Sequence, residues 1–130
     1  MDLYREIILD HYKHPKNFGT LKEKTVSVTE GNVTCGDLIS MDVFIKENRV
    51  ADIAFQGTGC AISISSASML TEEMKGKSVT EIMTLSGEHI VRYFGTTLTP
   101  SRTKCAVLSL EVLQKALVQS GEAVLKQSLK

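Results

Sequence analysis

The sequence predicts an α+β fold, in which a three-stranded antiparallel sheet packs with about five helices. Two observations carry this prediction. Three short segments with a hydrophobic period of two follow one another between residues 26 and 55, and the chain on both sides of them is patterned as helix. No repeat, low-complexity tract or linker interrupts the 130 residues, so we expect a single domain over 1–130.

The first predicted helix covers residues 2–13. Asp2 can cap its start, and His14-Pro15 stops it, because a residue that precedes proline disfavours the helical conformation. Its apolar residues recur at helical spacing; they are Leu3, Tyr4, Ile7, Ile8 and Tyr12.

The three strand segments follow a turn that ends at Gly19. Val26 and Val28 mark the first, residues 39–45 form the second and residues 51–55 the third. Glu47-Asn48 reads as a hairpin turn between the last two. Since apolar residues alternate with polar ones, we expect a sheet with one buried face.

The rest of the chain reads as helix, divided by cap and breaker residues. Ser78 and Glu81 form a capping-box pattern, and Thr99-Pro100 supplies an N-cap followed by proline at the first helical position. Helices are predicted at 61–75, 78–85, 89–94 and from 100 to the Ser120-Gly121 break, followed by a short or frayed tail over the last nine residues.

Composition excludes several classes of function. Fifteen basic residues balance fifteen acidic ones, and there is no tryptophan, which disfavours a nucleic-acid or membrane surface as partner. No leader pattern and no apolar run of roughly 20 residues is present, so we expect a cytoplasmic protein. Structural disulfides are not expected there, which leaves metal or thiol chemistry for an odd number of cysteines.

The three cysteines, Cys35, Cys60 and Cys105, have settings suited to a metal or a reactive sulfur. Cys35 and Asp37 share a loop between the first two strands, and the glycine between them lets thiol and carboxylate converge. Cys60 and Cys105 fall at or near predicted helix starts, where unpaired N–H groups favour an anionic sulfur. Three thiolates and one carboxylate make a four-ligand set for zinc or iron.

Spacing alone does not establish this site. No two cysteines are separated as C-x-x-C, so the fold must bring one ligand from each segment. The alternative is that all three are small buried apolar residues, as free cysteines often are.

The motifs around these residues resemble the scaffold proteins of iron–sulfur cluster assembly, the IscU and SufU type, also found as the N-terminal domain of NifU. The resemblance covers Tyr4 to about Leu117. Its motifs are Tyr4, Ile8-Leu9-Asp10-His11-Tyr12, His14-Pro15-Lys16-Asn17-Phe18-Gly19, Asn32, Cys35-Gly36-Asp37, Phe55, Gly57, Gly59-Cys60-Ala61-Ile62-Ser63, Ala67-Ser68-Met69 and Lys104-Cys105-Ala106.

The resemblance implies an α+β fold with a metal site built from Cys35, Asp37, Cys60 and Cys105. It implies a scaffold, not an enzyme, that accepts sulfur from a cysteine desulfurase, holds iron or a [2Fe–2S] cluster transiently, and passes the product to an acceptor protein. We expect about one zinc ion per chain in the isolated protein, because zinc favours thiolate-rich tetrahedral sites.

Two departures keep an alternative open. IscU members carry a histidine immediately before the last cysteine, where this chain has Lys104, as SufU members do. Yet the longer segment that SufU members insert between the second and third cysteines is absent. The alternative function is therefore a zinc-dependent sulfurtransferase that relays persulfide without building clusters. The resemblance to SufU implies that Cys35 accepts the sulfur, whereas the resemblance to IscU implies Cys105. Because Lys104 is the residue that SufU members have at this position, we favour Cys35.

Other functional classes are less well supported. A cysteine-nucleophile enzyme needs an activating base, and no histidine stands beside a cysteine in sequence. A purely structural zinc protein would have a closed, inert site. His11, His14 and His89 read as surface or capping residues, and the serines at 63, 65, 66 and 68 as small residues that let a helix pack closely.

Overall fold

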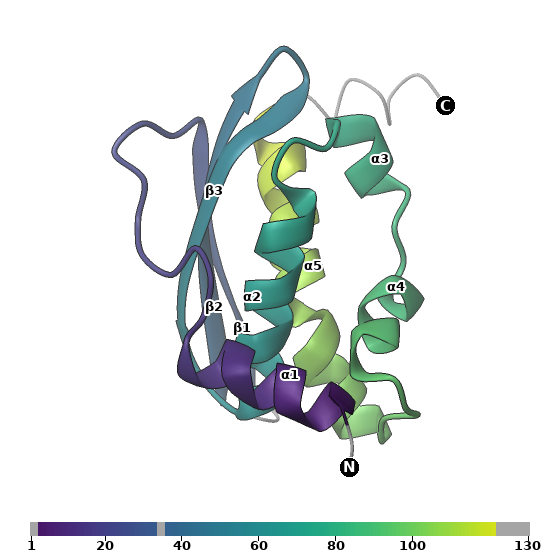
Figure 1. The fold of residues 1–130 in the computed structure, drawn as a ribbon. Helices are drawn as coiled ribbons and strands as arrows, with labels where there is room; N and C mark the ends of the chain where they lie inside the picture. The colour runs from purple at the N-terminus through teal and green to yellow at the C-terminus, as the bar shows by residue number, and fades with distance from the viewer. Residues whose placement is uncertain (1–2, 34–35, 122–130) are drawn as a thin grey trace.

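The computed structural model describes residues 3–33 and 36–121, in which three strands form a layer against a group of helices (Figure 1). Asp2, Cys35 and the predicted tail over 122–130 lie outside the described residues. The elements in chain order are α1 (Leu3–Lys13), β1 (Val26–Asn32), β2 (Asp37–Lys46), β3 (Arg49–Thr58), α2 (Ala61–Met74), α3 (Val79–Met83), α4 (Gly87–Val91), the 3₁₀ helix η1 (Arg92–Phe94) and α5 (Pro100–Gln119). The predicted α+β fold with a three-stranded antiparallel sheet is confirmed.

The sheet has the strand order β1-β2-β3, with both pairs antiparallel. In the β2–β3 hairpin, Glu47 and Asn48 adopt φ angles of 53° and 62°, the left-handed pair that a tight two-residue turn requires. One face of the sheet is covered by α2 and α5, which run side by side along it (Figure 1). The largest fully buried side chains between the layers include Ile39, Met41, Val43, Ile53, Phe55, Leu70, Met74, Leu113 and Leu117.

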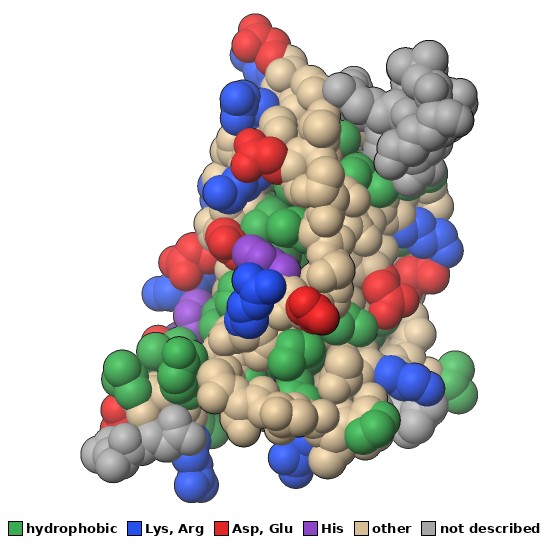
Figure 2. Space-filling model, turned by 90° about the vertical axis from the view of Figure 1, so that its right-hand side faces the viewer, with side chains coloured by type: hydrophobic (Ala, Val, Ile, Leu, Met, Phe, Trp, Pro, Cys, Tyr) green, Lys and Arg blue, Asp and Glu red, His purple; other side chains and the backbone are tan. Residues whose placement is uncertain are grey.

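The helix boundaries follow the cap residues. Ser78 Oγ accepts a hydrogen bond from the Glu81 N–H at 3.1 Å, and Thr99 Oγ1 accepts one from the Arg102 N–H at 3.4 Å. Two predicted boundaries were wrong. The helix that begins after Ser78 ends at Met83, and the segment predicted at 89–94 is α4, which begins at Gly87, followed by η1. Acidic and basic side chains intermingle on the face that carries α3 and α4 (Figure 2).

Helix α1 packs on α2, where its partly buried Ile8 contacts the core, and hydrogen bonds from α1 and from the turn after it reach α2. His11 Nδ1 is 2.6 Å from Ser68 Oγ, and Asn17 donates to Thr71 Oγ1 at 3.2 Å. No α1 residue is buried, and several of its apolar side chains are exposed, among them Leu3 and Tyr4. His11 therefore joins α1 to α2 by a long-range contact, which differs from the surface or capping role predicted from the sequence.

Asp42, on the outer face of β2, fixes the connection that leads into β1. It accepts hydrogen bonds from the Leu21 N–H at 3.0 Å and from Ser27 Oγ at 2.7 Å, and Lys24 Nζ is 3.4 Å away. Burial alone would raise the pKa of Asp42. The hydrogen bonds from Ser27 and Leu21, together with Lys24, outweigh burial and hold the pKa below its ordinary value of 3.8.

The lowered pKa of Asp42 gives a pH-dependent contribution to stability. A carboxyl group with a depressed folded-state pKa stabilises the fold above its unfolded pKa and loses that contribution as pH falls through the folded value. We expect Asp42→Ala to lower the free energy of unfolding by about 1–3 kcal/mol at pH 7 and by clearly less at pH 2 to 3. Urea unfolding at both pH values measures this.

The control for Asp42 is Asp52→Ala. Asp52 is half-exposed in an ion pair with Lys75, and its loss should cost roughly 0–1 kcal/mol. An equal difference between parent and Asp42→Ala at both pH values would contradict the assigned role.

Candidate metal centre

Three side chains that can bind metal meet at one end of the molecule. One oxygen of Asp37 and the sulfurs of Cys60 and Cys105 all lie within 4.8 Å of one another. Asp37 and Cys105 are buried, at 2% and 3% exposure, and Cys60 is exposed. The protein thus buries two of the three donor side chains and leaves the third, that of Cys60, exposed to solvent.

The strand pairing brings Asp37 and Cys60 together. Asp37 is the first residue of β2, and β3 runs antiparallel so that Leu38 pairs with Thr58. The chain leaves β3 beside Asp37, and Cys60 becomes the N-cap residue of α2. The cysteine of α5 joins them because α5 packs against α2, and both helices begin at this end (Figure 1).

Gly59 permits the close approach of Asp37 to the backbone. Its φ angle is 152°, and a Cβ atom there would lie 2.2 Å from Asp37 Oδ1 and 2.8 Å from Ser63 Oγ. Any larger residue would displace the carboxylate. Glycine is therefore required at position 59, immediately before Cys60, because it leaves room for the Asp37 carboxylate.

Asp37 is oriented toward Cys60 by the backbone. Asp37 Oδ1 accepts a hydrogen bond from the Cys60 N–H at 3.0 Å, and Asp37 Oδ2 is 3.9 Å from Cys60 Sγ. If both groups are anionic they repel at this distance unless a cation lies between them. Two sulfurs and one carboxylate oxygen are also donor types that zinc and iron accept. The donor set thus fits a thiophilic metal ion.

The position of Cys105 differs from the prediction. It is the sixth residue of α5, beyond the first turn, whose N–H groups are the unpaired ones. The favourable field of a helix start therefore applies to Cys60, the N-cap of α2, and not to Cys105.

Arg102 and Lys104, the two basic residues close to Cys105 in sequence, line different hollows. Arg102 lines a hollow of about 460 Å³ that we call the thiol hollow, formed by Cys60, Ala61, Ile62, Ser101, Arg102 and Cys105. Lys104 lines a separate hollow with Asn32, Val33 and Glu111, beside the end of β1. Of the two predicted cations, Arg102 is the one that lines the same hollow as Cys60 and Cys105.

Cys35, the fourth predicted ligand, lies outside the described residues. Its described neighbours connect β1 to β2: the Gly36 N–H donates to Asn32 O at 2.8 Å, and Asp37 follows immediately. Its membership of the site stays a prediction.

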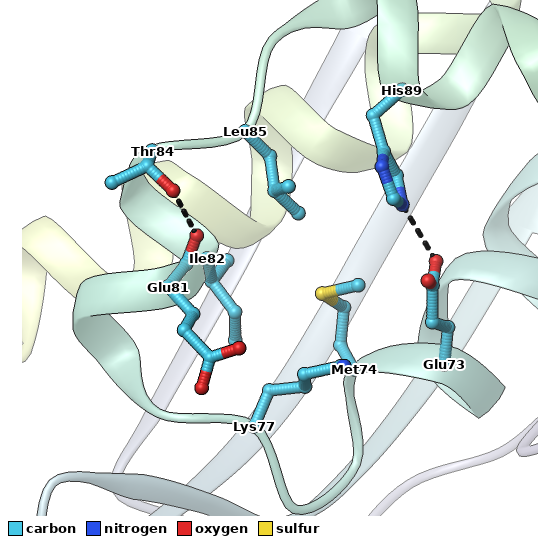
Figure 3. Close-up of a pocket in the computed structure, with 8 residues that line it drawn as sticks. All are labelled: Glu73, Met74, Lys77, Glu81, Ile82, Thr84, Leu85 and His89. Carbon is cyan, nitrogen blue, oxygen red and sulfur yellow. Dashed lines mark hydrogen bonds and ion pairs between the residues drawn. The ribbon is translucent and has the colours of Figure 1, made fainter.

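Of the residues predicted to be structural, His89 lies away from the metal centre. His89 contacts Glu73 Oε1 at 2.7 Å beside a small pocket at the far end of α2, where it points toward the carboxylate (Figure 3). Tyr93 donates to the same oxygen. The serines of α2 at positions 63, 65, 66 and 68 are buried, as expected of residues that allow close packing.

Sequence reasoning missed the contact between Ser63 and Cys60. Ser63 Oγ lies 3.9 Å from Cys60 Sγ. The spacing of three residues after the N-cap could have indicated it, because the side chain at that position turns back toward the cap.

Residues 3–125 match the NifU-like N terminal domain family, and the chain belongs to that family. It is 37% identical over 134 residues to the zinc-dependent sulfurtransferase SufU of Bacillus subtilis, with 90% of each chain covered. It is 34% identical over 116 residues to the iron-sulfur cluster assembly scaffold protein IscU 1 of Archaeoglobus fulgidus, covering 89% of this chain and 75% of the relative.

Solved structures show the same fold. A proposed iron–sulfur cluster assembly scaffold protein for the SUF system from Fervidobacterium islandicum superposes with a TM-score of 0.77 at 25% identity, covering 86% of this chain and 94% of that one. A NifU-like N-terminal protein from Brucella abortus gives the same TM-score at 18% identity, which bears on the fold alone, and covers 92% of this chain and 95% of that one. Among the described residues, no helix has the length and apolar character needed to cross a membrane.

Proposed function

We propose that this protein is a scaffold for iron–sulfur cluster assembly that accepts sulfur from a cysteine desulfurase. The observation that carries the proposal is the cluster of Asp37, Cys60 and Cys105 at an open end of the molecule. Its relatives include proteins named as IscU scaffolds, which supports the same function. Iron and persulfide sulfur are the substrates in this proposal, a thiol reductant supplies the two electrons that convert each persulfide sulfur to sulfide, and a downstream acceptor protein receives the product.

The chain's own residues have separate tasks in this function. Cys60 is exposed and can meet an incoming ion, while Asp37 and Cys105 are buried and hold their donor atoms in place. A resident zinc ion, when bound by Cys35, Asp37, Cys60 and Cys105, would keep the thiols deprotonated. Arg102 in the thiol hollow places a positive charge where anionic sulfur species approach.

A second candidate function is a zinc-dependent sulfur relay without cluster assembly. It is favoured by the 37% identity to a protein named zinc-dependent sulfurtransferase over 90% of both chains. Lys104, immediately before the last cysteine, also favours the sulfur relay, because SufU members carry lysine at that position. In both functions a desulfurase is the partner, and the reducing cytoplasm, where thiols stay free, is the compartment.

One experiment separates the two candidates. The purified protein is analysed for metal, and desulfurase turnover is then measured with and without it. The scaffold proposal requires that ferrous iron, cysteine, the desulfurase and a thiol reductant, which supplies the two electrons that convert each persulfide sulfur to sulfide, produce a [2Fe–2S] absorption spectrum on this chain. Stimulated turnover with zinc retained and no cluster spectrum would support the relay and reject the scaffold.

Sulfur receipt gives a prediction for the individual cysteines. The receiving thiolate attacks the terminal sulfur of the desulfurase persulfide, and the desulfurase cysteine leaves as a thiolate. Cys105 is 3% exposed, so a bulky donor reaches it poorly. We expect the added sulfur on Cys35, and its loss in Cys35→Ser, when peptides are mapped by mass spectrometry after reaction with desulfurase and cysteine.

The same experiment with Cys105→Ser is the control, and we expect it to keep the persulfide. Persulfide on Cys105 in Cys35→Ser, formed at the parental rate, would overturn the choice of Cys35.

A further inference from the structure

Ser63 occupies a buried position between the metal centre and the start of α2. It is the third residue of the helix and is 1% exposed. Its hydroxyl donates to the Cys60 carbonyl at 3.1 Å, and its Oγ lies 3.9 Å from Cys60 Sγ. A Cβ atom on Gly59 would contact both Ser63 Oγ and Asp37 Oδ1, so the serine and the carboxylate face the same narrow space.

The contact between Ser63 and Cys60 must change direction when a metal binds. As a thiol, Cys60 donates its proton toward Asp37 Oδ2 or Ser63 Oγ, each 3.9 Å away. A metal-bound sulfur carries no proton and can only accept. An ionised Asp37 is likewise an acceptor only, whereas the Ser63 hydroxyl can rotate about its Cβ–Oγ bond and turn its single proton from the Cys60 carbonyl to the Cys60 sulfur.

We propose that Ser63 is a positioning residue of the metal centre, whose hydroxyl donates a hydrogen bond to the Cys60 sulfur when metal is bound. This inference rests on the proposed metal-binding function. Hydrogen bonds to ligand atoms orient them and change metal affinity, and those to sulfur also tune its reactivity. Donation stabilises the deprotonated sulfur and fixes its orientation, so Ser63 should strengthen zinc retention. It also withdraws electron density from the sulfur, which restrains attack by the bound sulfur on electrophiles.

Ser65 provides a matched control on the same helix. It is also buried, and its hydroxyl also donates to the α2 backbone, to Ala61 O at 2.5 Å and Ile62 O at 3.3 Å. The hydrogen bonds of its hydroxyl therefore go to the helix backbone and not to Cys60. Ser63→Ala and Ser65→Ala each delete one buried hydroxyl from α2, and alanine keeps the helical preference high.

The experiment compares parent, Ser63→Ala and Ser65→Ala in the zinc-loaded form. Zinc affinity is measured by competition with a chromogenic chelator, and alkylation by iodoacetamide is mapped to Cys60 by mass spectrometry. We expect Ser63→Ala to bind zinc roughly tenfold more weakly, the usual size of such a loss, and to alkylate faster at Cys60. Ser65→Ala should match the parent in both measurements, and the metal-free unfolding midpoints of the two variants should agree.

The outcomes separate this inference from the proposed function. Parental affinity and parental alkylation in Ser63→Ala would overturn the role of Ser63, and so would equal changes in Ser63→Ala and Ser65→Ala. If the parent itself bound no zinc, or if Cys60→Ser bound it as tightly as the parent, the metal-binding function would fail and this inference with it.

Discussion

Cys60→Ser is expected to lose the zinc ion that we expect the isolated parent protein to bind at about one per chain. Cys60 Sγ is one of three donor atoms that lie within 4.8 Å of one another, so its removal takes away a proposed ligand. Loss of an indirect partner alone costs about 10- to 100-fold in affinity, and loss of a ligand should exceed the upper end of that range. Elemental analysis of the purified variant, followed by chelator competition, measures the loss.

Lys104→Ala is the control for this prediction. Lys104 lines a hollow other than the one that contains Cys60 and Cys105, so its removal should leave zinc content unchanged. Full zinc occupancy with unchanged thiol reactivity in Cys60→Ser would refute a shared site. The metal-free protein should stay folded, because the hydrophobic cluster packed between the sheet and α2 and α5 includes none of the three proposed ligands, although Cys105 is buried beside it. Collapse of the fold on chelation would instead indicate a structural zinc protein.

The sequence predicted those features that depend on local rules. The positive φ angles at Glu47 and Asn48 follow from turn chemistry, and the Ser78 and Thr99 caps follow from the need to satisfy free N–H groups. Alternation along β2 likewise predicted that Ile39, Met41 and Val43 are buried. In each case a few neighbouring residues decide the outcome.

The parts of the site that the sequence did not predict depend on contacts between elements. Arg102 and Lys104 are two positions apart on α5, and only the packing of α5 decides which of them lines the thiol hollow. The pairing of β2 with β3 brings Asp37 against Gly59, which periodicity alone does not indicate. The motifs identified the ligand types, whereas the fold determines which neighbours act on them.

Asp37→Ala should hold a reconstituted [2Fe–2S] cluster longer than the parent protein does. A carboxylate is a harder and more exchangeable donor than a thiolate, so its presence in a thiolate-rich site favours release. The variant leaves the Cys60 N–H without the acceptor it has at 3.0 Å, which should cost about 1 kcal/mol of stability and leave the fold intact. Decay of the cluster's visible absorption under air, and transfer to an apo-ferredoxin, are the measurements, with Asp52→Ala as a carboxylate control away from the site. Because Asp37 is 2% exposed and lies beside both sulfurs, its effect on the cluster should be direct. Faster loss of the cluster from Asp37→Ala than from the parent would show that Asp37 retains the cluster and does not promote its release.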